Sequence, residues 1–158
     1  MRIYISNFGI ASALMCISDV TSQMFETKWK FEKLDVQRTI KMTLLGGLTN
    51  GLCLTKWYKF IDVLFKGKIF PKIIADQLVY SPLSISFFLI TTNKDNCSLN
   101  GYRSRVNERF IDIWKSDCCV WPVTNYLNFK YIPMYKQPVF TSCIDLAWNT
   151  YISHTLHK

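Results

Sequence analysis

The sequence has few charged residues and no grouping of side chains that is typical of a catalytic or metal site. Charged residues make up 19% of its 158 residues, against about 25% in average globular proteins. The six cysteines form no C-x-x-C pair, and His154 and His157 lie close to the last residue, so the ligand spacing of a zinc site is missing. No G-x-S-x-G motif, phosphate-binding loop or credible Cys/His pair occurs. We therefore expect no catalytic residues, no metal, no cofactor and no enzymatic activity.

The charged residues that are present avoid four apolar windows: 3–25, 42–55, 73–93 and 137–157. Only Asp19, Asp76 and Asp145 lie inside these windows. A soluble helical bundle spreads its charges along the outer face of every helix, whereas a bilayer separates them from apolar blocks of about 20 residues. The sequence therefore predicts an all-α, multipass membrane helix bundle in one membrane domain over 1–158, with about four transmembrane helices.

The net charge of +8 raises nucleic-acid binding as an alternative, because basic chains with aromatics can contact phosphates and stack on bases. The basic residues form no single run, however, and flank the apolar blocks at 28–41 and 56–72. Lys and Arg in such places reach for lipid headgroups. We expect the lipid bilayer as the partner and no direct contact with nucleic acid, and a homo-oligomer is compatible with this pattern.

The four expected spanning helices cover about 3–25, 35–64, 70–92 and 137–157. The uncharged centre of the second is short for a bilayer core of ~30 Å, so the lysines at its edges must extend to the interface. In the third, Pro82 is expected to produce a kink, which a membrane helix tolerates where neighbouring helices satisfy the freed carbonyl.

Between the third and fourth helices we expect an amphipathic and re-entrant segment, at about 102–133. Residues 102–117 separate apolar from charged side chains as a helix on the membrane surface does. Trp121-Pro122 and Pro133 then bracket an aromatic and amide-rich stretch. We expect the chain to enter the bilayer and bend there.

Each expected helix carries a narrow polar stripe. A charge at the bilayer centre costs at least ~2.5 kcal/mol, so the three aspartates should face inward. One interpretation is hydrogen bonding between helices, which is ordinary in membrane proteins; the other is a water-filled path. The residues alone favour the first. The candidates for the polar interior are Asp19, Gln23, Arg38, Asn50, Asp76, Gln77, Asn128, Asp145 and Asn149.

Small and aromatic residues in the second helix predict close packing and a membrane interface. Gly47 and Gly51 form a G-x-x-x-G pattern, whose ordinary role is helix packing, and Gly46 precedes it. Trp57 and Tyr58 lie where an aromatic belt is expected.

Several blocks have the order and spacing of a known family. They are 18–23 (G-D-x-x-x-Q, with Ser18 for Gly), 35–39 (D-x-x-R-T), 57–58 (W-Y), 72–82 (K-x-x-x-D-Q-x-x-x-x-P), 121–133 (W-P-x-x-(Q/N)-x-x-N-F-x-x-(V/I)-P) and 148–153 (W-N-x-Y-(L/I)-S). Over nearly the whole chain they resemble the Mpv-seventeen / peroxisomal membrane protein twenty-two family. Leu52 in place of Pro, Asn125 in place of Gln and Gln137 in place of a basic residue make the chain a divergent member. The helix-packing and motif residues are Gly46, Gly47, Gly51, Trp57, Tyr58, Pro82, Trp121, Pro122, Phe129, Pro133, Trp148 and Tyr151.

The resemblance implies a small multipass protein of the mitochondrial inner membrane or, as an alternative, the peroxisomal membrane. It also implies channel-like or transporter-like passage of small solutes that supports organelle homeostasis, with an indirect link to reactive-oxygen metabolism and mitochondrial DNA maintenance. The family supplies no defined solute. The alternative from another class is a non-conducting membrane scaffold or assembly factor.

Overall fold

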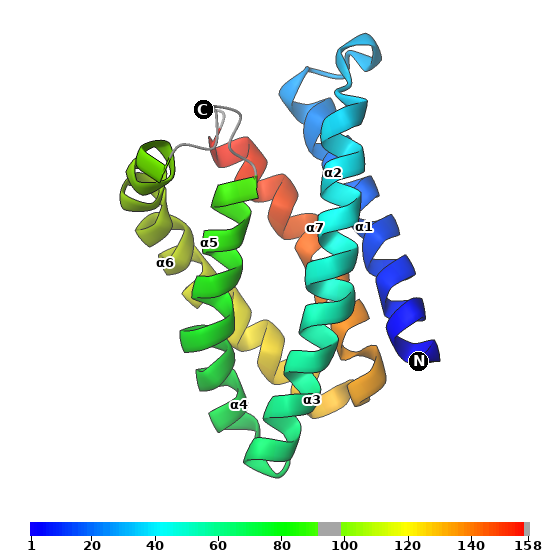
Figure 1. The fold of residues 1–158 in the computed structure, drawn as a ribbon, viewed down its shortest axis with the longest axis vertical. Coiled ribbons are helices and arrows are strands. Elements are labelled where there is room, and N and C mark those ends of the chain that lie inside the picture. Colours follow the sequence, from blue (N-terminus) through cyan, green and yellow to red (C-terminus); the bar gives the residue numbers. More distant parts are fainter. Residues whose placement is uncertain (92–98, 157–158) are drawn as a thin grey trace. The chain divides into compact units, whose positions relative to one another are not determined.

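The chain is helical throughout the part that the structure describes. The computed structural model describes the backbone of residues 1–91 and 99–156, and the side chains of 1–90 and 109–148. No strand occurs in these backbone ranges. The elements (Figure 1) are α1 (Arg2–Glu26), η1 (Phe31–Lys33), α2 (Val36–Gly46), η2 (Gly47–Cys53), α3 (Leu54–Phe65), α4 (Ile69–Ala75), η3 (Asp76–Tyr80), α5 (Ser81–Thr91), α6 (Leu99–Tyr131), η4 (Met134–Lys136) and α7 (Gln137–Leu156).

Two of the helical rods contain a π-helical segment. α2, η2 and α3 run on without a break, as do α4, η3 and α5 (Figure 1). η3 ends two residues before Pro82, whose ring would clash with the carbonyl four residues earlier in a regular helix. A wider π turn at that point removes the clash, and such turns are frequent at functional sites.

The contacts divide the chain into two compact units. Unit 1 comprises Met1–Phe60 and Tyr131–Lys158, and unit 2 comprises Ile61–Lys130. In unit 1, α1 packs against α2, η2 and α7. In unit 2, the rod α4–η3–α5 contacts α6 through the side chains described below. The expectation of one membrane domain over 1–158 stays a prediction.

Glycines permit a close approach of two helices inside unit 1. A methyl group added at Gly51 would lie 2.5 Å from Cα and 2.9 Å from the backbone nitrogen of Phe8 on α1. At Gly46 it would lie 2.5 Å from Cβ of Met15, and at Gly47 it would meet Ser12 and the Phe8 ring. The G-x-x-x-G face therefore lies directly on the backbone of α1.

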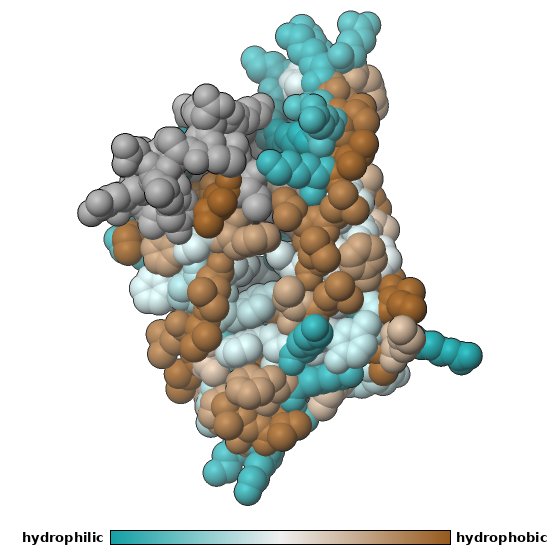
Figure 2. Space-filling model, viewed as in Figure 1, coloured by the Kyte–Doolittle hydropathy of each residue, from teal (hydrophilic) through white to brown (hydrophobic). Residues whose placement is uncertain are grey.

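Apolar side chains lie on the outside and polar ones inside. In the most apolar windows of Arg2–Glu26 and Ile69–Ile90, only 22% and 28% of the residues are buried. Val63 and Phe70 are 78% and 71% exposed, and hydrophobic side chains spread over the face shown in Figure 2. Large exposed apolar surfaces mark contact with lipid or partners. The chain is an all-α membrane protein, as predicted.

The four helices expected from the sequence are all present. By length and composition, two of the described helices could cross a membrane: Arg2–Glu26 and Ile69–Ile90. The rod formed by α2, η2 and α3, called the second rod below, has Lys41 and Lys56 on either side of its short uncharged centre. These lysines lower its mean hydropathy. The number of four spans stays a prediction.

The expected re-entrant segment within about 102–133 is not observed. α6 is a continuous helix over Leu99–Tyr131, and Pro122 lies inside it. The physical reason is the spacing of its buried side chains: Asp117, Trp121, Asn125 and Asn128 recur at helical intervals, which places them on one face. That face contacts the rod α4–η3–α5 only if the helix is kept through the proline.

Candidate functional site

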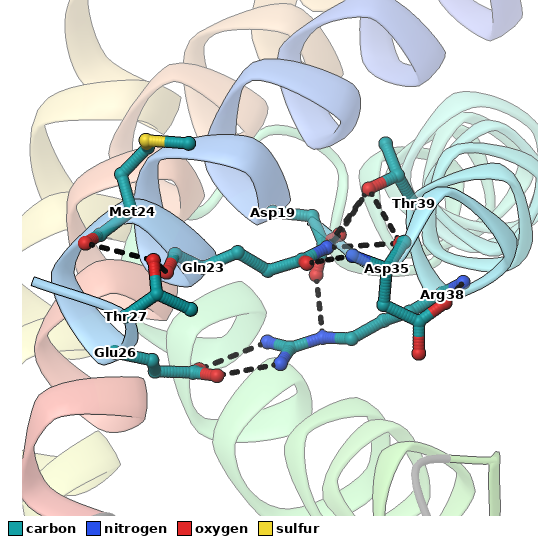
Figure 3. A network of polar contacts seen from close by, with 8 residues as sticks. All are labelled: Asp19, Gln23, Met24, Glu26, Thr27, Asp35, Arg38 and Thr39. Carbon is teal, nitrogen blue, oxygen red and sulfur yellow. Dashed lines mark hydrogen bonds and ion pairs between the residues drawn. The ribbon is translucent and has the colours of Figure 1, made fainter. Parts of the chain in front are cut away.

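In unit 1, the carboxylate of Asp19, 5% exposed, accepts three hydrogen bonds close to the end of α1 (Figure 3). Gln23 Nε2 donates to its Oδ2 at 2.7 Å, and Thr39 Oγ1 donates to the same oxygen at 2.8 Å. Arg38 Nε donates to Oδ1 at 2.9 Å and forms an ion pair. Asp19 and Gln23 are four residues apart on one helix face, so α1 presents both side chains to the beginning of α2.

The same network closes the turn between α1 and α2. Arg38 Nη1 and Nη2 donate to the two carboxylate oxygens of Glu26 at 2.7 and 3.0 Å, a bidentate geometry that is stronger than a single contact. Asp35 is the N-cap of α2 and accepts from the backbone nitrogen of Arg38 at 2.9 Å. The backbone nitrogen of Asp35 donates to Gln23 Oε1 at 2.7 Å. These bonds fasten two helices and their link to one another.

Further polar contacts join α7 to the second rod of unit 1. Asn50 Nδ2, in η2, donates to Asp145 Oδ2 at 2.6 Å. The hydroxyl groups of Tyr58 and Thr141 lie 3.0 Å apart, and both residues are buried. The polar stripes of these helices therefore meet each other.

In unit 2, the rod α4–η3–α5 and α6 run antiparallel with their polar side chains in register. At one end, Lys72 is buried, forms an ion pair with Asp62, and lies 5.6 Å from the ring centroid of Phe129. One turn further along the rod, Asp76 Oδ2 accepts a hydrogen bond from Asn125 Nδ2 at 2.6 Å. The pairs 72 with 129 and 76 with 125 advance by four residues in opposite directions, which defines the antiparallel register.

The next turn holds a second carboxylate. Asp117 Oδ2 accepts from Gln77 Nε2 at 3.1 Å and from Ser81 Oγ at 2.5 Å. Gln77 Nε2 also lies 3.2 Å from Cys118 Sγ. Asp117, Gln77 and Ser81 are all buried. A row of polar groups therefore runs along the contact between the two helices.

The polar row ends at an apolar cluster. Ile85, Leu89 and Ile113 are buried together, and Phe110 and Trp114 pack against them. Ile85 lies one helical turn after Ser81 on α5, and Ile113 lies one turn before Asp117 on α6, so the cluster continues the same helix contact. The contact between the helices is thus polar over the turns that carry η3 and apolar beyond them.

The structure distributes the nine predicted interior residues over both units. Asp19, Gln23 and Arg38 lie in one network, and Asn50 pairs with Asp145, all in unit 1. Asp76 and Gln77 lie in the polar row of unit 2, and Asn128 is fully buried on the same face of α6. The side chain of Asn149 lies outside the described residues.

The predicted packing and motif residues also have defined places. Gly46, Gly47 and Gly51 face α1, and Tyr58 is buried while Trp57 lies 5.9 Å from the Phe60 ring. The others lie as follows: Pro82 at the start of α5, Trp121 buried on α6, Pro122 inside α6, Phe129 beside Lys72, Pro133 before η4, and Trp148 half-buried on α7. The side chain of Tyr151 is outside the described residues.

Sequence reasoning missed Asp117 and Lys72 as buried charges and Asn125 as the partner of Asp76. They were missed because the sequence analysis assigned Asp117 to a surface helix over 102–117 and the amides to a re-entrant stretch between Pro122 and Pro133. The recurrence of polar or aromatic residues at 117, 121, 125 and 128 was the signal that could have found them, since it has the period of a helix.

Relatives of known name match nearly the whole chain. A mitochondrial inner membrane protein Mpv17 from Drosophila melanogaster is 26% identical over 100% of this chain and 98% of its own length. A PXMP2/4 family protein 2 from Dictyostelium discoideum is 30% identical over 89% of this chain and 78% of its own length. A mitochondrial inner membrane protein Mpv17 from Xenopus laevis is 26% identical over 94% and 86%. No solved structure matches.

The location predicted from the sequence agrees with these names. The mitochondrial inner membrane is named for the relatives from Drosophila, Xenopus and Danio rerio, which confirms that prediction, while PXMP names stand beside them. A model of the Mpv17 / PMP22 family matches residues 95–153, a range that contains α6 and most of α7. With the 30% identity over most of both chains, these matches show that the chain belongs to the Mpv17 / PMP22 family.

Proposed function

We propose that the chain is a channel-like or transporter-like protein that lets small polar solutes pass through the mitochondrial inner membrane. The observation that carries this proposal is the row of buried polar side chains in unit 2, which follows a helix long and apolar enough to cross a bilayer. Polar groups inside a membrane helix pair are costly and are often retained for function. Any contribution to mitochondrial DNA maintenance or reactive-oxygen metabolism is indirect in this proposal, through solute supply.

The apolar cluster gives this path a closed state. A polar solute that follows the row from Lys72 past Asp76 and Asp117 meets Ile85, Leu89 and Ile113. Apolar constrictions of this kind close pores by excluding water. Opening requires the two helices to separate at this cluster, whose three buried side chains are aliphatic and form no hydrogen bond. The π turn in η3 lies at the polar end of the path and allows local change of helix register.

A flux measurement tests the proposal. Purified protein is reconstituted into phosphatidylcholine vesicles that hold uncharged solutes of graded size and a large dextran. We expect release of the small solutes with retention of the dextran. Leu89→Ser, in the buried cluster, should accelerate release several-fold because it hydrates the constriction. The control is Leu83→Ser on the same helix, where the leucine is 66% exposed; it should not change the rate of release.

A second pair of variants tests the polar row itself. Asp76→Asn removes the charge that accepts from Asn125 and should change the rate or size limit of release. The matched control is Asp112→Asn, on an exposed position of α6, which should leave release unchanged. Vesicles that lose no solute with either the wild type or Leu89→Ser would contradict the proposal.

The second candidate function, a non-conducting scaffold or assembly factor, is favoured by the network around Asp19. There, the carboxylates of Asp19 and Glu26 each form an ion pair with Arg38, as in contacts that serve packing alone. Absence of flux together with a defined complex on native gels of mitochondrial membranes would support this function instead.

A further inference from the structure

Asp117 is a buried carboxylate whose partners are neutral. It is 5% exposed, and it is hydrogen-bonded by the Gln77 amide, the Ser81 hydroxyl and the Trp121 side chain. Among the side chains at 1–90 and 109–148, the ion pairs involve Asp19, Glu26 and Asp62, and none involves Asp117. An ionised carboxylate that has left water without a cation nearby is costly. The neutral acid avoids this cost.

The Gln77 amide has one atom that an ionised Asp117 cannot satisfy. Gln77 is 9% exposed, and its Oε1 is buried without a hydrogen-bond donor among the described residues. Its Nε2 points at Asp117 and Cys118. A buried acceptor without a hydrogen bond costs about 1–3 kcal/mol of folding free energy. An ionised carboxylate offers only acceptors, whereas a protonated one carries an O–H donor.

We propose that Asp117, together with Gln77 and Ser81, is a reversible proton-binding site within unit 2. On protonation, the carboxyl O–H donates to Gln77 Oε1 after the amide turns by half a rotation. One proton is taken up, and the local charge changes from minus one to zero. Ser81 Oγ keeps its hydrogen bond to Oδ2, the oxygen that Gln77 also faces. In the same step the orphaned amide oxygen gains a donor and the carboxylate loses its uncompensated charge, while Gln77 Nε2 gives up its contacts with Asp117 and Cys118.

Among the described side chains close to Asp117 and Gln77, the other charged groups leave this role to Asp117. On the facing rod, Lys72 is paired with Asp62, and Asp76 accepts from Asn125. On α6, Asp112 and Lys115 are exposed. The remaining titratable side chains within two helical turns are Tyr80, near Gln77 on the facing rod, and Cys118 and Cys119, next to Asp117 on α6. The proton site does not depend on solute passage, because it rests on groups that touch one another in the resting helix pair.

Infrared difference spectroscopy of the full chain in lipid nanodiscs tests the site. As the pH is lowered from about 8 to about 4, the wild type should gain the carbonyl-stretch band of a protonated, buried carboxylic acid, and the band should shift in D₂O. Asp117→Asn should lose this band, while the matched control Asp112→Asn should keep it. Asp117→Glu should retain a band at a shifted position, and Gln77→Leu should move the band because the acceptor of the acid O–H is gone.

Two results would overturn the proposal. One is a band that persists in Asp117→Asn with folded protein, as judged by unchanged helical circular dichroism. The other is the absence of a band in wild type combined with a thermal midpoint that rises with sodium chloride but not with choline chloride, which would indicate a metal-cation site. The measurement uses no flux, so a failure of solute passage leaves its outcome intact.

Discussion

At the residue scale, the buried charges of this protein differ in what compensates them. Asp19 is held by Arg38 at 2.9 Å and by two neutral donors, and Lys72 is held by Asp62. Asp117 is held by neutral donors alone. A buried ion pair adds little net stability, because desolvation of the two charges offsets their attraction. Removing one partner is destabilising, because it leaves the other charge uncompensated. These sites should therefore respond differently to substitution.

Arg38→Met should destabilise the protein strongly. It leaves Asp19 without its cation and frees Glu26, so we expect a loss of about 3 kcal/mol in the free energy of unfolding. Denaturation in mild detergent with increasing dodecyl sulfate measures it. Lys41→Met, on an exposed position of the same helix, serves as the control and should be near neutral.

The double variant Asp19→Asn with Arg38→Met separates charge pairing from packing. If the ion pair carries the effect, the two changes together should cost less than their sum by roughly 0.5–3 kcal/mol. Strict additivity would show that Arg38 acts through its contact with Glu26 or through its aliphatic stem instead.

At the element scale, glycine determines how near α1 and the second rod can lie. The atoms that a Cβ at Gly51 would meet belong to the backbone of Phe8, and a backbone cannot rotate away as a side chain can. The approach brings the adjoining start of α3 close enough to α1 for the hydrogen bond between Asn7 Nδ2 and Thr55 Oγ1, at 3.0 Å. Small residues serve membrane helix packing in this way.

Gly51→Ala should therefore force α1 and η2 apart. We expect a loss of about 1–3 kcal/mol in unfolding free energy, although alanine is the better helix former. Gly9→Ala is the matched control, because nothing lies within 4 Å of its added methyl; it should be neutral or stabilising by up to about 1 kcal/mol. Equal effects of the two substitutions would refute close backbone packing at Gly51.

At the scale of the whole molecule, the apolar exterior requires lipid. Val63, Phe70 and Leu83 are 78%, 71% and 66% exposed, while the polar side chains of Asp76 and Asn125 are buried. Such a surface would aggregate in water. The structure and the family thus agree on an integral membrane protein.

Alkaline carbonate should leave the protein in the membrane pellet. Mitochondria that contain a tagged chain are treated at high pH, which strips peripheral proteins because their contacts are electrostatic, whereas helices buried in hydrocarbon stay. A matrix enzyme and an inner-membrane carrier are the two controls. Swelling the outer membrane should leave the tagged chain with the inner-membrane marker, and recovery in the supernatant or with peroxisomes would contradict the assignment.

The sequence by itself determined the fold class, the helices and the family. Charges excluded from apolar windows reflect the cost of ions in lipid, which acts on each segment separately and is visible without coordinates. The glycine pattern at 46–51 likewise predicts close helix packing from neighbouring residues alone, and the motif D-x-x-R-T indicates the family in the same way. The continuity of α6 through Pro122 and the partners of Asp76 and Asp117 were decided only by tertiary structure. A proline breaks a helix by default, and only contact with a second helix, in which Asn125 and Asp117 must fall on one face, outweighs that local preference.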